Sequence, residues 1–244
     1  MTNGGQRIAT SSGVMLADPA GIGNALQGYG ESLFDPEFWA ARGELAAVDG
    51  GRGSAWFIGS ARSRWVLRHY RRGGFIARFS QDRYLWSGER RVRAFAEWRL
   101  LAHLVQRRLP VPQPIAAWYR RTGLTYRCDL IMQRLPDSLP LSAWLRSAAL
   151  PPAAWRAIGA VIANLHHAGV DHADLNAHNI LLDAAQSVSV IDFDRGRLRT
   201  PGMWRLRNLR RLHRSLAKIA LALPPGRFIP QAWDALLAGY EAGG

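Results

Sequence analysis

The chain has 244 residues and is 48% hydrophobic, which is enough apolar sequence to bury a core and excludes a disordered tail. Its formal net charge is +14, and all of its 32 basic residues except Lys218 are arginines. Codon bias would explain part of the arginine excess. The net positive charge favours polyanionic partners such as nucleic acid, anionic lipid or phosphorylated substrates. The single cysteine, Cys128, cannot form an intrachain disulfide, and we expect no signal peptide, so a reducing compartment fits best. We also expect no transmembrane helix, because no apolar run reaches about 18 residues.

Residues 1–30 are rich in glycine, serine and other small residues without hydrophobic periodicity, which predicts a loose leader or a single edge strand. A helix start follows at Asp35, Pro36 and Glu37, where a capping carboxylate precedes a proline and an acid in the first turn. We expect a short helix to continue from there through Leu45.

A glycine-rich turn at residues 50–53 precedes two apolar runs, 55–58 and 65–67, which predict a hairpin. Glycines let backbone amides approach phosphate oxygens, although a glycine turn in a hairpin is most often only structural. Residues 75–79 predict a third strand that contains Arg78. Taken alone, Arg78 fits a solvated, outward-facing side chain better than a phosphate contact.

Between residues 89 and 108, apolar side chains recur every three or four positions, which predicts a helix with Glu97 near its middle. Most glutamates in such a setting are exposed partners of nearby arginines. Prolines within 110–114 end the helix, and strand-like runs follow at 115–119 and 126–132.

A proline-containing linker at 133–141 separates this strand-rich half from a helical half. Helices are predicted at 141–147 and 152–168. The second helix carries one apolar stripe, which we interpret as core packing and not as a ligand site.

The groups best suited to metal and phosphate chemistry lie within residues 172–194. Apolar runs at 179–182 and 188–191 predict two strands around a turn, which would hold Asn179 and Asp192 at neighbouring ends. Carboxylate and amide oxygens are ligands that suit Mg²⁺, and Asp174 would lie in the same cleft, free to accept a hydroxyl proton. Each residue alone fits an ordinary loop or cap, whereas the joint pattern indicates a catalytic site.

These motifs resemble those of the protein kinases. Residues 172–179, His-Ala-Asp-Leu-Asn-Ala-His-Asn, are similar to the catalytic loop H-R-D-L-x-x-x-N, and residues 192–194, Asp-Phe-Asp, are similar to the metal motif D-F-G. The resemblance covers nearly the whole chain and implies a two-lobed α+β fold. Residues 1–134 would form a small, mainly antiparallel β N-lobe with one key helix, and residues 135–244 a mainly helical C-lobe.

The same resemblance implies roles for individual residues, with ATP and Mg²⁺ as cofactors. Asp174 would be catalytic, and Asn179 and Asp192 would bind the metal. The nucleotide contacts would be Gly51 and Gly53 in the glycine turn, Arg78 supported by Glu97, and Gln133 and Leu135 in the hinge. Kinases have a lysine where Arg78 stands, and a guanidinium fork would alter the geometry of that contact.

Three segments, 51–57, 68–74 and 172–176, resemble more closely the bacterial 3-deoxy-D-manno-octulosonic acid (Kdo) kinases, a protein-kinase-like family that acts on the lipopolysaccharide inner core. This resemblance implies transfer of the ATP γ-phosphate to the 4-hydroxyl of a Kdo sugar on lipid A precursor. Ala173 and Asp194 depart from the kinase arginine and glycine, and Ala173 argues against control by a phosphorylated activation loop. Only about fifty residues follow Asp192, without an Ala-Pro-Glu signature, which favours a small or glycolipid acceptor over a peptide.

Residues 203–223 predict an amphipathic basic helix. The apolar side of such a helix most often packs on its own domain, but the helix can also lie on an anionic membrane. Either arrangement of the helix is compatible with an acceptor embedded in the inner leaflet. We therefore expect the protein to associate peripherally with the cytoplasmic face of the inner membrane. We expect no nucleic-acid partner. The predicted apolar side consists of Leu206, Leu209, Leu212, Leu216 and Ile219.

Two other functions stay open. The same phosphate machinery would serve a kinase of a core heptose or of a soluble hydroxylated compound, which a panel of acceptors would separate. A catalytically silent basic protein that binds nucleic acid or anionic lipid is the alternative of another class. Absence of thermal stabilisation by ATP and Mg²⁺ would favour that alternative.

Overall fold

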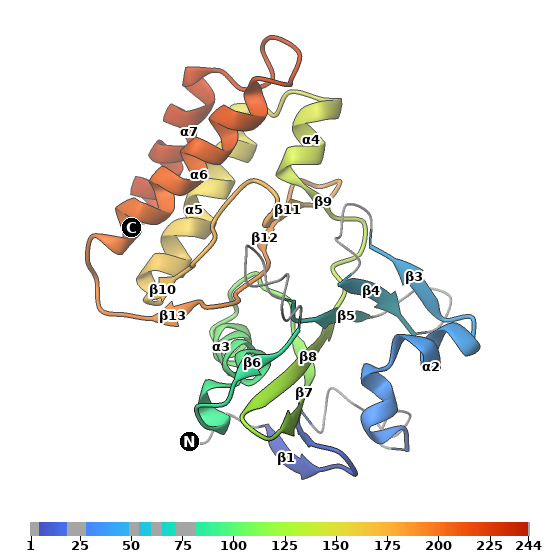
Figure 1. The fold of residues 1–244 in the computed structure, drawn as a ribbon. Helices are drawn as coiled ribbons and strands as arrows, with labels where there is room; N and C mark the ends of the chain where they lie inside the picture. Colours follow the sequence, from blue (N-terminus) through green and yellow to red (C-terminus); the bar gives the residue numbers. More distant parts are fainter. Residues whose placement is uncertain (1–4, 19–27, 49–53, 60–64, 72–81, 244) are drawn as a thin grey trace. The chain divides into compact units, whose positions relative to one another are not determined.

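The computed structural model describes residues 5–18, 28–48, 54–59, 65–71 and 82–243 (Figure 1). Its contacts divide the chain into two compact units. Unit 1 comprises Met1–His103 and Gln113–Arg134, and unit 2 comprises Leu104–Pro112 and Leu135–Gly244. Residues 104–112 thus belong to unit 2, although they precede the lobe boundary expected at residue 134.

Within the described residues, the frame of unit 1 is an antiparallel sheet of eight strands in the order β1-β2-β7-β8-β5-β4-β3, with β6 also paired to β8. The predicted hairpin is confirmed as β4 and β5, whereas the expected strand at 75–79 lies outside the described residues. The elements are β1 (Gln6–Ala9), β2 (Val14–Ala17), η1 (Gly30–Phe34), α2 (Pro36–Ala41), β3 (Leu45–Ala47), β4 (Ala55–Ile58), β5 (Trp65–His69), β6 (Tyr84–Leu85), η3 (Glu89–Arg91), α3 (Arg93–Gln106), β7 (Pro114–Thr122) and β8 (Thr125–Gln133).

The N-terminal segment forms two strands, so the expectation of a loose leader or a single edge strand was wrong. β1 and β2 make an antiparallel hairpin, and β2 continues the sheet by pairing with β7. The turn is closed by a hydrogen bond from Thr10 N to Gly13 O at 3.1 Å. A Cβ atom at Gly13 would overlap the carbonyl oxygen of Tyr119, so glycine is what lets the turn lie against β7.

The helix predicted at Asp35 is confirmed as α2, but it is shorter than expected. The Asp35 carboxylate caps it by accepting a hydrogen bond from Glu37 N at 2.9 Å, and Pro36 occupies the first turn. The helix ends at Ala41 because Gly43 adopts φ +69° and reverses the chain. Leu45, which was assigned to this helix, instead begins β3.

The two faces of the sheet have different coverings. One face packs against α3, where the Phe95 ring meets Tyr119 edge-on with centroids 5.2 Å apart. The other is covered by η1 and α2, and the Phe34 ring stacks on Trp118 at 5.8 Å. The buried core on this second face consists of Met15, Ala17, Leu33, Phe34, Trp39, Ile58, Leu67, Ile115, Ala116 and Ile131.

Unit 2 is mainly helical and also contains short strands. Strands β9, β11 and β12 form one small antiparallel sheet, and β10 pairs with β13. The elements are β9 (Leu139–Pro140), α4 (Leu141–Ser147), α5 (Pro152–His167), β10 (Val170–Asp171), β11 (Ile180–Leu182), β12 (Val188–Val190), β13 (Arg197–Leu198), α6 (Trp204–Ala220) and α7 (Pro230–Ala242).

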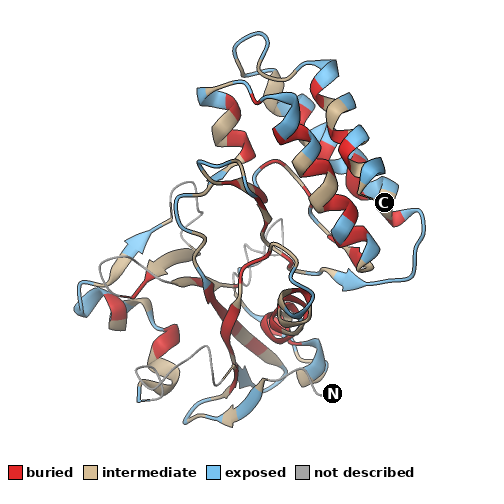
Figure 2. Cartoon of the chain, turned by 180° about the vertical axis from the view of Figure 1, so that it is seen from behind, coloured by how far each residue is buried: buried red, intermediate tan, exposed pale blue. Residues whose placement is uncertain are grey.

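Helices α5 and α7 pack with their backbones in close contact. A Cβ atom on Gly159 of α5 would overlap the Leu236 carbonyl oxygen of α7, and one on Gly239 of α7 would overlap the Arg156 carbonyl oxygen of α5. Both helices contain buried residues, and buried stretches are drawn red in Figure 2. Reciprocal glycines therefore allow these helices to approach more closely than helices with larger side chains at the crossing.

The predicted amphipathic helix is confirmed as α6, with one correction to its apolar side. Leu209, Leu212 and Leu216 are buried, but Leu206 is 45% exposed. Leu206 lies three residues before Leu209, yet it falls at the margin of the stripe that faces the unit. The helix therefore buries a narrower stripe than its sequence predicts.

The predicted α+β fold, with an antiparallel sheet in the N-terminal part and helices in the C-terminal part, is confirmed. Among the helices in the described part of the chain, none combines the length and apolar character required to cross a bilayer.

Candidate active site

The predicted catalytic loop begins directly after helix α5 and strand β10. Gly169 adopts φ +80° between the helix and the strand, where a Cβ atom would lie 2.8 Å from the Arg199 carbonyl oxygen. The chain therefore reverses at a position that suits glycine. Asp171, at the end of β10, pairs with Arg199 Nη1 at 3.0 Å through its Oδ2 atom, which fixes the entry to the loop.

The buried His172 side chain joins the two halves of the site. Its Nε2 atom lies 3.0 Å from the Ile191 carbonyl oxygen, and its Nδ1 atom accepts a hydrogen bond from Asp174 N at 3.1 Å. This pattern requires a neutral ring with the proton on Nε2. Burial lowers the pKa of His172, although the bond to Ile191 O and nearby carboxylates act in the opposite direction. A neutral ring therefore ties the catalytic loop to the strand that leads to Asp192.

Asp174 is held through its backbone, while its carboxylate remains accessible. Its carbonyl oxygen accepts hydrogen bonds from Asn176 Nδ2 at 3.0 Å and from Asn179 Nδ2 at 2.9 Å. The side chain is 57% exposed. The loop thus presents this carboxylate to solvent from a fixed backbone, as a group that accepts a substrate proton requires.

Strands β11 and β12 place Asn179 and Asp192 at the same end of their hairpin. Ile191 N donates to Asn179 O at 2.9 Å, one residue before Asp192. Asp192 adopts φ +64°, an unusual backbone conformation for a residue other than glycine, and Phe193 beyond it is buried against the His172 ring at 4.8 Å. The hairpin therefore brings together the two metal ligands that were predicted.

The donor set of Asn179 and Asp192 is compatible with Mg²⁺. Because Nδ2 of Asn179 donates to Asp174 O, the amide oxygen is the end of this side chain that can serve as a ligand. Two protein oxygens are sufficient for Mg²⁺, which usually keeps several waters and binds substrate phosphates. No group of three His, Cys, Asp or Glu side chains that would suit a metal ion occurs in the part of the chain that the structure describes.

Helix α6 contacts the catalytic loop through three polar residues that the sequence reasoning did not assign to the site. Asn208 Oδ1 accepts from His172 N at 3.0 Å, and Ser215 Oγ accepts from Ala177 N at 3.2 Å. Between them, Arg211 Nη1 lies 3.1 Å from Asp174 Oδ1. Their spacing of three and four residues was the available signal, because it places them on one face of the helix.

Glu97 is 2% exposed, so the expectation for an isolated helical glutamate, an exposed partner of arginines, was wrong. Its Oε1 atom lies 3.2 Å from Arg68 Nη1, and its other oxygen accepts a short hydrogen bond from the buried Tyr70 hydroxyl. Burial, and next the charge of Glu97, raise the pKa of Tyr70 well above its ordinary value. Glu97 therefore holds a buried polar cluster on the α3 side of the sheet.

The other predicted nucleotide contacts are only partly described. Gly51, Gly53 and Arg78 lie outside the described residues. Gln133 is exposed at the end of β8, where its N–H donates to Gln113 O at 2.8 Å. Leu135 is half-buried and lies between β8 and β9, in unit 2.

Comparison with known proteins gives a consistent assignment. Residues 36–240 match the model of the lipopolysaccharide kinase (Kdo/WaaP) family. A protein from Xanthomonas oryzae pv. oryzae (strain PXO99A), named 3-deoxy-D-manno-octulosonic acid kinase, is 54% identical over 212 residues, which are 86% of this chain and 84% of that protein.

Relatives with the same name occur in other bacteria. Those from Xanthomonas axonopodis pv. citri (strain 306) and Stenotrophomonas maltophilia (strain K279a) are 54% and 50% identical, each over 77% of this chain and 75% of the relative. The chain therefore belongs to the lipopolysaccharide kinase (Kdo/WaaP) family.

Proposed function

We propose that this protein is a Kdo kinase that transfers the γ-phosphate of ATP to the 4-hydroxyl of a Kdo sugar on lipid A precursor, in synthesis of the lipopolysaccharide core. Family membership and the relatives' shared name support the phosphotransferase class and the acceptor. The observation that carries the proposal is the Asp174 carboxylate, exposed on a loop whose backbone is fixed by His172 and Asn179.

Asp174 would orient the acceptor hydroxyl and take its proton. The hydroxyl oxygen then forms a bond to the γ-phosphorus, the bond between that phosphorus and the bridging oxygen of ADP breaks, and the proton moves to the carboxylate. Phosphoryl transfer depends mainly on positioning, and the hydrogen bonds to Asp174 N and O supply that positioning on the protein side.

Asn179 and Asp192 would hold Mg²⁺ through the amide and carboxylate oxygens. The ion, when bound, neutralises phosphate charge and orients the phosphates for transfer. The left-handed backbone at Asp192 and the hydrogen bond from Asn179 Nδ2 to Asp174 O would fix these ligands before the nucleotide arrives. Pre-fixed ligands lower the ordering cost of binding.

In unit 1, the nucleotide phosphates would be covered by Gly51 and Gly53 and contacted by Arg78, with Glu97 as its support. The buried carboxylate of Glu97 already binds one guanidinium, that of Arg68. The Glu97 carboxylate would thus orient arginine side chains near the phosphates. Because it is paired with a guanidinium, it would not expose a free negative charge to the phosphates. Gln133 and Leu135 would contact the rest of the nucleotide.

Arg211 would recognise the acid group of the acceptor sugar. Its side chain is 48% exposed, and its contact with Asp174 uses only one of its two terminal nitrogens. Guanidinium groups bind carboxylates through two parallel hydrogen bonds, and an octulosonic acid carries a carboxylate. The positive charge of Arg211 would thus attract the acceptor carboxylate and bring the sugar next to Asp174, the proposed base.

The protein would associate peripherally with the cytoplasmic face of the inner membrane. The exposed residues of α6 combine cations with Leu206, and Met203 and Leu221 at its ends are also exposed. Anionic lipid attracts such surfaces by roughly 1 kcal/mol per basic residue. Flotation with anionic vesicles should recover the protein at low salt and lose it at high salt; retention in high salt would contradict electrostatic binding. The exposed cations of α6 are Arg207, Arg210, Arg211, Arg214 and Lys218.

Transfer of labelled γ-phosphate to Kdo-lipid A precursor tests the proposal. We expect Asp174→Asn to lower kcat by about 10²–10⁴-fold while the protein stays folded. Asp183→Asn, a change to an aspartate of the neighbouring hairpin, serves as the control and should keep the wild-type rate. Equal rates for wild type and Asp174→Asn would contradict the role of Asp174.

The product and the acceptor range test the substrate. Label on the 4-position of Kdo is the expected result. Label on a heptose, or transfer to a soluble hydroxylated compound in preference to Kdo, would contradict the acceptor while retaining the kinase reaction. Absence of thermal stabilisation by ATP with Mg²⁺ would contradict the kinase reaction itself.

A further inference from the structure

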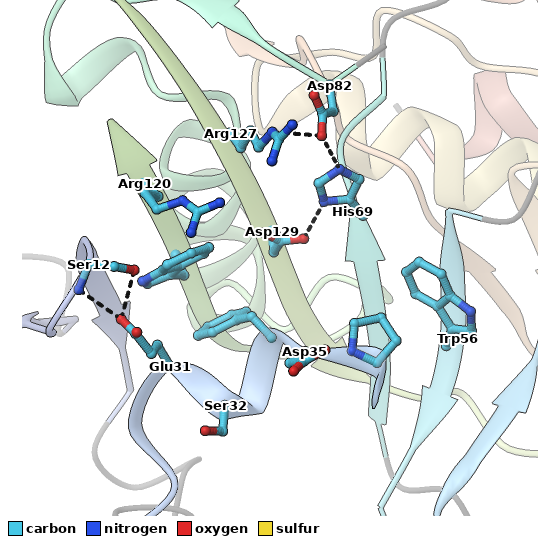
Figure 3. A pocket seen from close by; sticks show the side chains of 13 residues that line it. Ser12, Glu31, Ser32, Asp35, Trp56, His69, Asp82, Arg120, Arg127 and Asp129 are labelled. Atoms are coloured by element: carbon cyan, nitrogen blue, oxygen red, sulfur yellow. Dashed lines mark hydrogen bonds and ion pairs between the residues drawn. The ribbon is translucent and has the colours of Figure 1, made fainter. Parts of the chain in front are cut away.

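A polar cavity of about 470 Å³ lies in unit 1 on the face of the sheet opposite α3 (Figure 3). Arg68 and Tyr70 contact Glu97 of α3, so His69 between them points to the other face, where it lines the cavity. The volume falls within the range of about 300–1,000 Å³ found for small-molecule sites. Among the residues that the structure describes, none that is proposed to act in phosphoryl transfer lines this cavity.

The floor of the cavity is a network of paired charges. His69 Nδ1 donates to Asp129 Oδ1 at 2.6 Å, and His69 Nε2 lies 3.5 Å from Asp82 Oδ2. The same Asp82 oxygen forms an ion pair with Arg127 Nε at 2.8 Å. Asp129 is 4% exposed, and its burial raises its pKa in opposition to the effect of His69. The network is thus fixed within the protein and largely balanced in charge.

Burial disfavours the charged form of His69, but the hydrogen bond and charge of Asp129, and then the charge of Asp82, outweigh that effect and raise its pKa. The ring therefore stays protonated over a wider pH range than a free histidine, with a hydrogen bond to Asp129 and an ion pair with Asp82. As a result, each carboxylate on the floor retains lone pairs that can accept hydrogen bonds from a ligand, without presenting an uncompensated negative charge.

Indole rings and polar rim groups complete the lining. Trp118 is held by its stack on Phe34 and by the hydrogen bond from its Nε1 atom to Thr10 Oγ1 at 3.2 Å. Trp56 lies on the other side of the floor, as Figure 3 shows. Glu31 is fixed by hydrogen bonds from Ser11 and Ser12. The Trp118 ring and the Glu31 carboxylate are therefore held in place by neighbouring residues.

We propose that this cavity is a binding site for an uncharged saccharide of one or two rings. A sugar ring presents C–H groups that pack against an indole face, and hydroxyls that both donate and accept hydrogen bonds. The lining supplies both kinds of partner next to each other, with guanidinium donors at Arg120 and Arg127 and carboxylate acceptors at Asp82 and Glu31.

The charges of the lining favour neither a strongly anionic nor a strongly cationic ligand. Four carboxylates, from Glu31, Asp35, Asp82 and Asp129, lie in the same lining as Arg120, Arg127 and His69, so the lining has almost no net charge and a phosphorylated or sulfated ligand would gain little from it. A cation would gain little, because Asp82 and Asp129 already pair with protein cations and Glu31 is stabilised by hydroxyl and amide donors. A neutral, polyhydroxylated ligand needs no net charge from the lining and can use both its donors and its acceptors.

Saturation-transfer NMR on the full chain without ATP tests this inference independently of the kinase reaction. The probes are methyl mannoside, N-acetylglucosamine and a free heptose, with spermidine as the cationic probe and methyl phosphate as the anionic one. We expect at least one neutral sugar to bind with a dissociation constant in the millimolar range, and Asp174→Asn to leave that binding unchanged.

Arg120→Ala is the primary variant, because Arg120 is exposed and its loss should not affect folding. We expect it to weaken sugar binding by about tenfold or more. Trp56→Ala, a second variant, should abolish the saturation transfer to the ring protons. Arg107→Ala, a change to an exposed arginine that is not among the cavity-lining residues, is the matched control. Equal sugar binding in wild type and Arg120→Ala, binding of spermidine or methyl phosphate alone, or binding of no neutral sugar would each overturn the proposal.

Discussion

Arg211 Nη1 lies 3.1 Å from Asp174 Oδ1, so a helix that follows the predicted D-F-G-like motif by about ten residues supplies a cation to the catalytic loop. Both side chains are about half exposed, and an exposed ion pair contributes little to stability. The contact is therefore of interest for substrate binding and not for folding.

Arg211→Ala should raise the KM for Kdo-lipid A precursor by about tenfold or more, with a smaller change in kcat, because the guanidinium would bind the acceptor carboxylate. Arg214→Ala, one turn further along the exposed side of α6, is the matched control for lost positive charge. Steady-state kinetics with varied acceptor measures the effect. Equal KM changes in the two variants would mean that Arg211 acts only through overall charge.

Asp192→Asn and Asn179→Ala should each weaken binding of ATP with Mg²⁺, because each removes or weakens one of the two proposed metal ligands. The measurement is the shift in Tm on adding ATP with Mg²⁺, compared with ATP and EDTA. Wild type should show a larger shift with Mg²⁺, and the variants should lose most of that difference. A full Mg²⁺-dependent shift in Asp192→Asn would contradict its assignment as a ligand.

Glu97→Gln should lower the free energy of unfolding by about 2 kcal/mol, because the buried carboxylate accepts charge-assisted bonds from Arg68 and Tyr70 that an amide cannot fully replace. Urea unfolding measures the change. Glu37→Gln, at an exposed position in α2, should change stability by less than about 0.5 kcal/mol. A neutral effect of Glu97→Gln would indicate that the buried cluster contributes no net stability.

The stability of unit 2 should fall as the pH is lowered from about 6.5 to about 4. Burial is the main cause that lowers the pKa of His166 to about 4, from an ordinary value of 6.5. Between these values the unfolded chain binds a proton that the folded chain does not, so acid favours unfolding, by up to about 3 kcal/mol. The stabilising effect of the neutral ring is fully present above pH 6.5.

The ring nitrogens of His166 lie 2.8 Å from the Tyr240 hydroxyl and 3.4 Å from Asn208 Oδ1. Chemical denaturation of His166→Gln across this pH range should show a flatter dependence than wild type. Gln231→Ala, a change to an exposed and non-titrating residue of the same unit, should leave the dependence unchanged. Identical slopes in wild type and His166→Gln would contradict the assignment.

Gly159→Ala should destabilise the protein by about 2–3 kcal/mol, because the added methyl group would overlap the backbone of α7 at Leu236 and force the helices apart. Gly202→Ala is the control, since a Cβ atom there would meet no atom closer than 3.6 Å. Thermal unfolding measures both. Equal Tm values for the two variants would show that the α5–α7 crossing adapts without cost.

Local patterns in the sequence were sufficient to predict several elements. The cap at Asp35, the hairpin of β4 and β5, the helix around Glu97 and the strands around residues 179–191 depend on neighbours a few positions away, and all are present in the structure. The predicted end of α2 was wrong because Gly43, with a positive φ, ends the helix before Leu45, which the apolar pattern had placed within it.

The motif at residues 172–194 also determined, by the sequence alone, the family and the residues expected to act in it. Only the tertiary structure decided how Asp174 is held and which cation lies beside it, because Ile191, Asn208 and Arg211 contact the loop from 19 to 37 residues further along the chain. It likewise decided that Glu97 is buried and that His69 and Asp129 meet in a cavity. Such contacts depend on strand register and helix packing, which bring distant side chains together without leaving a local signal.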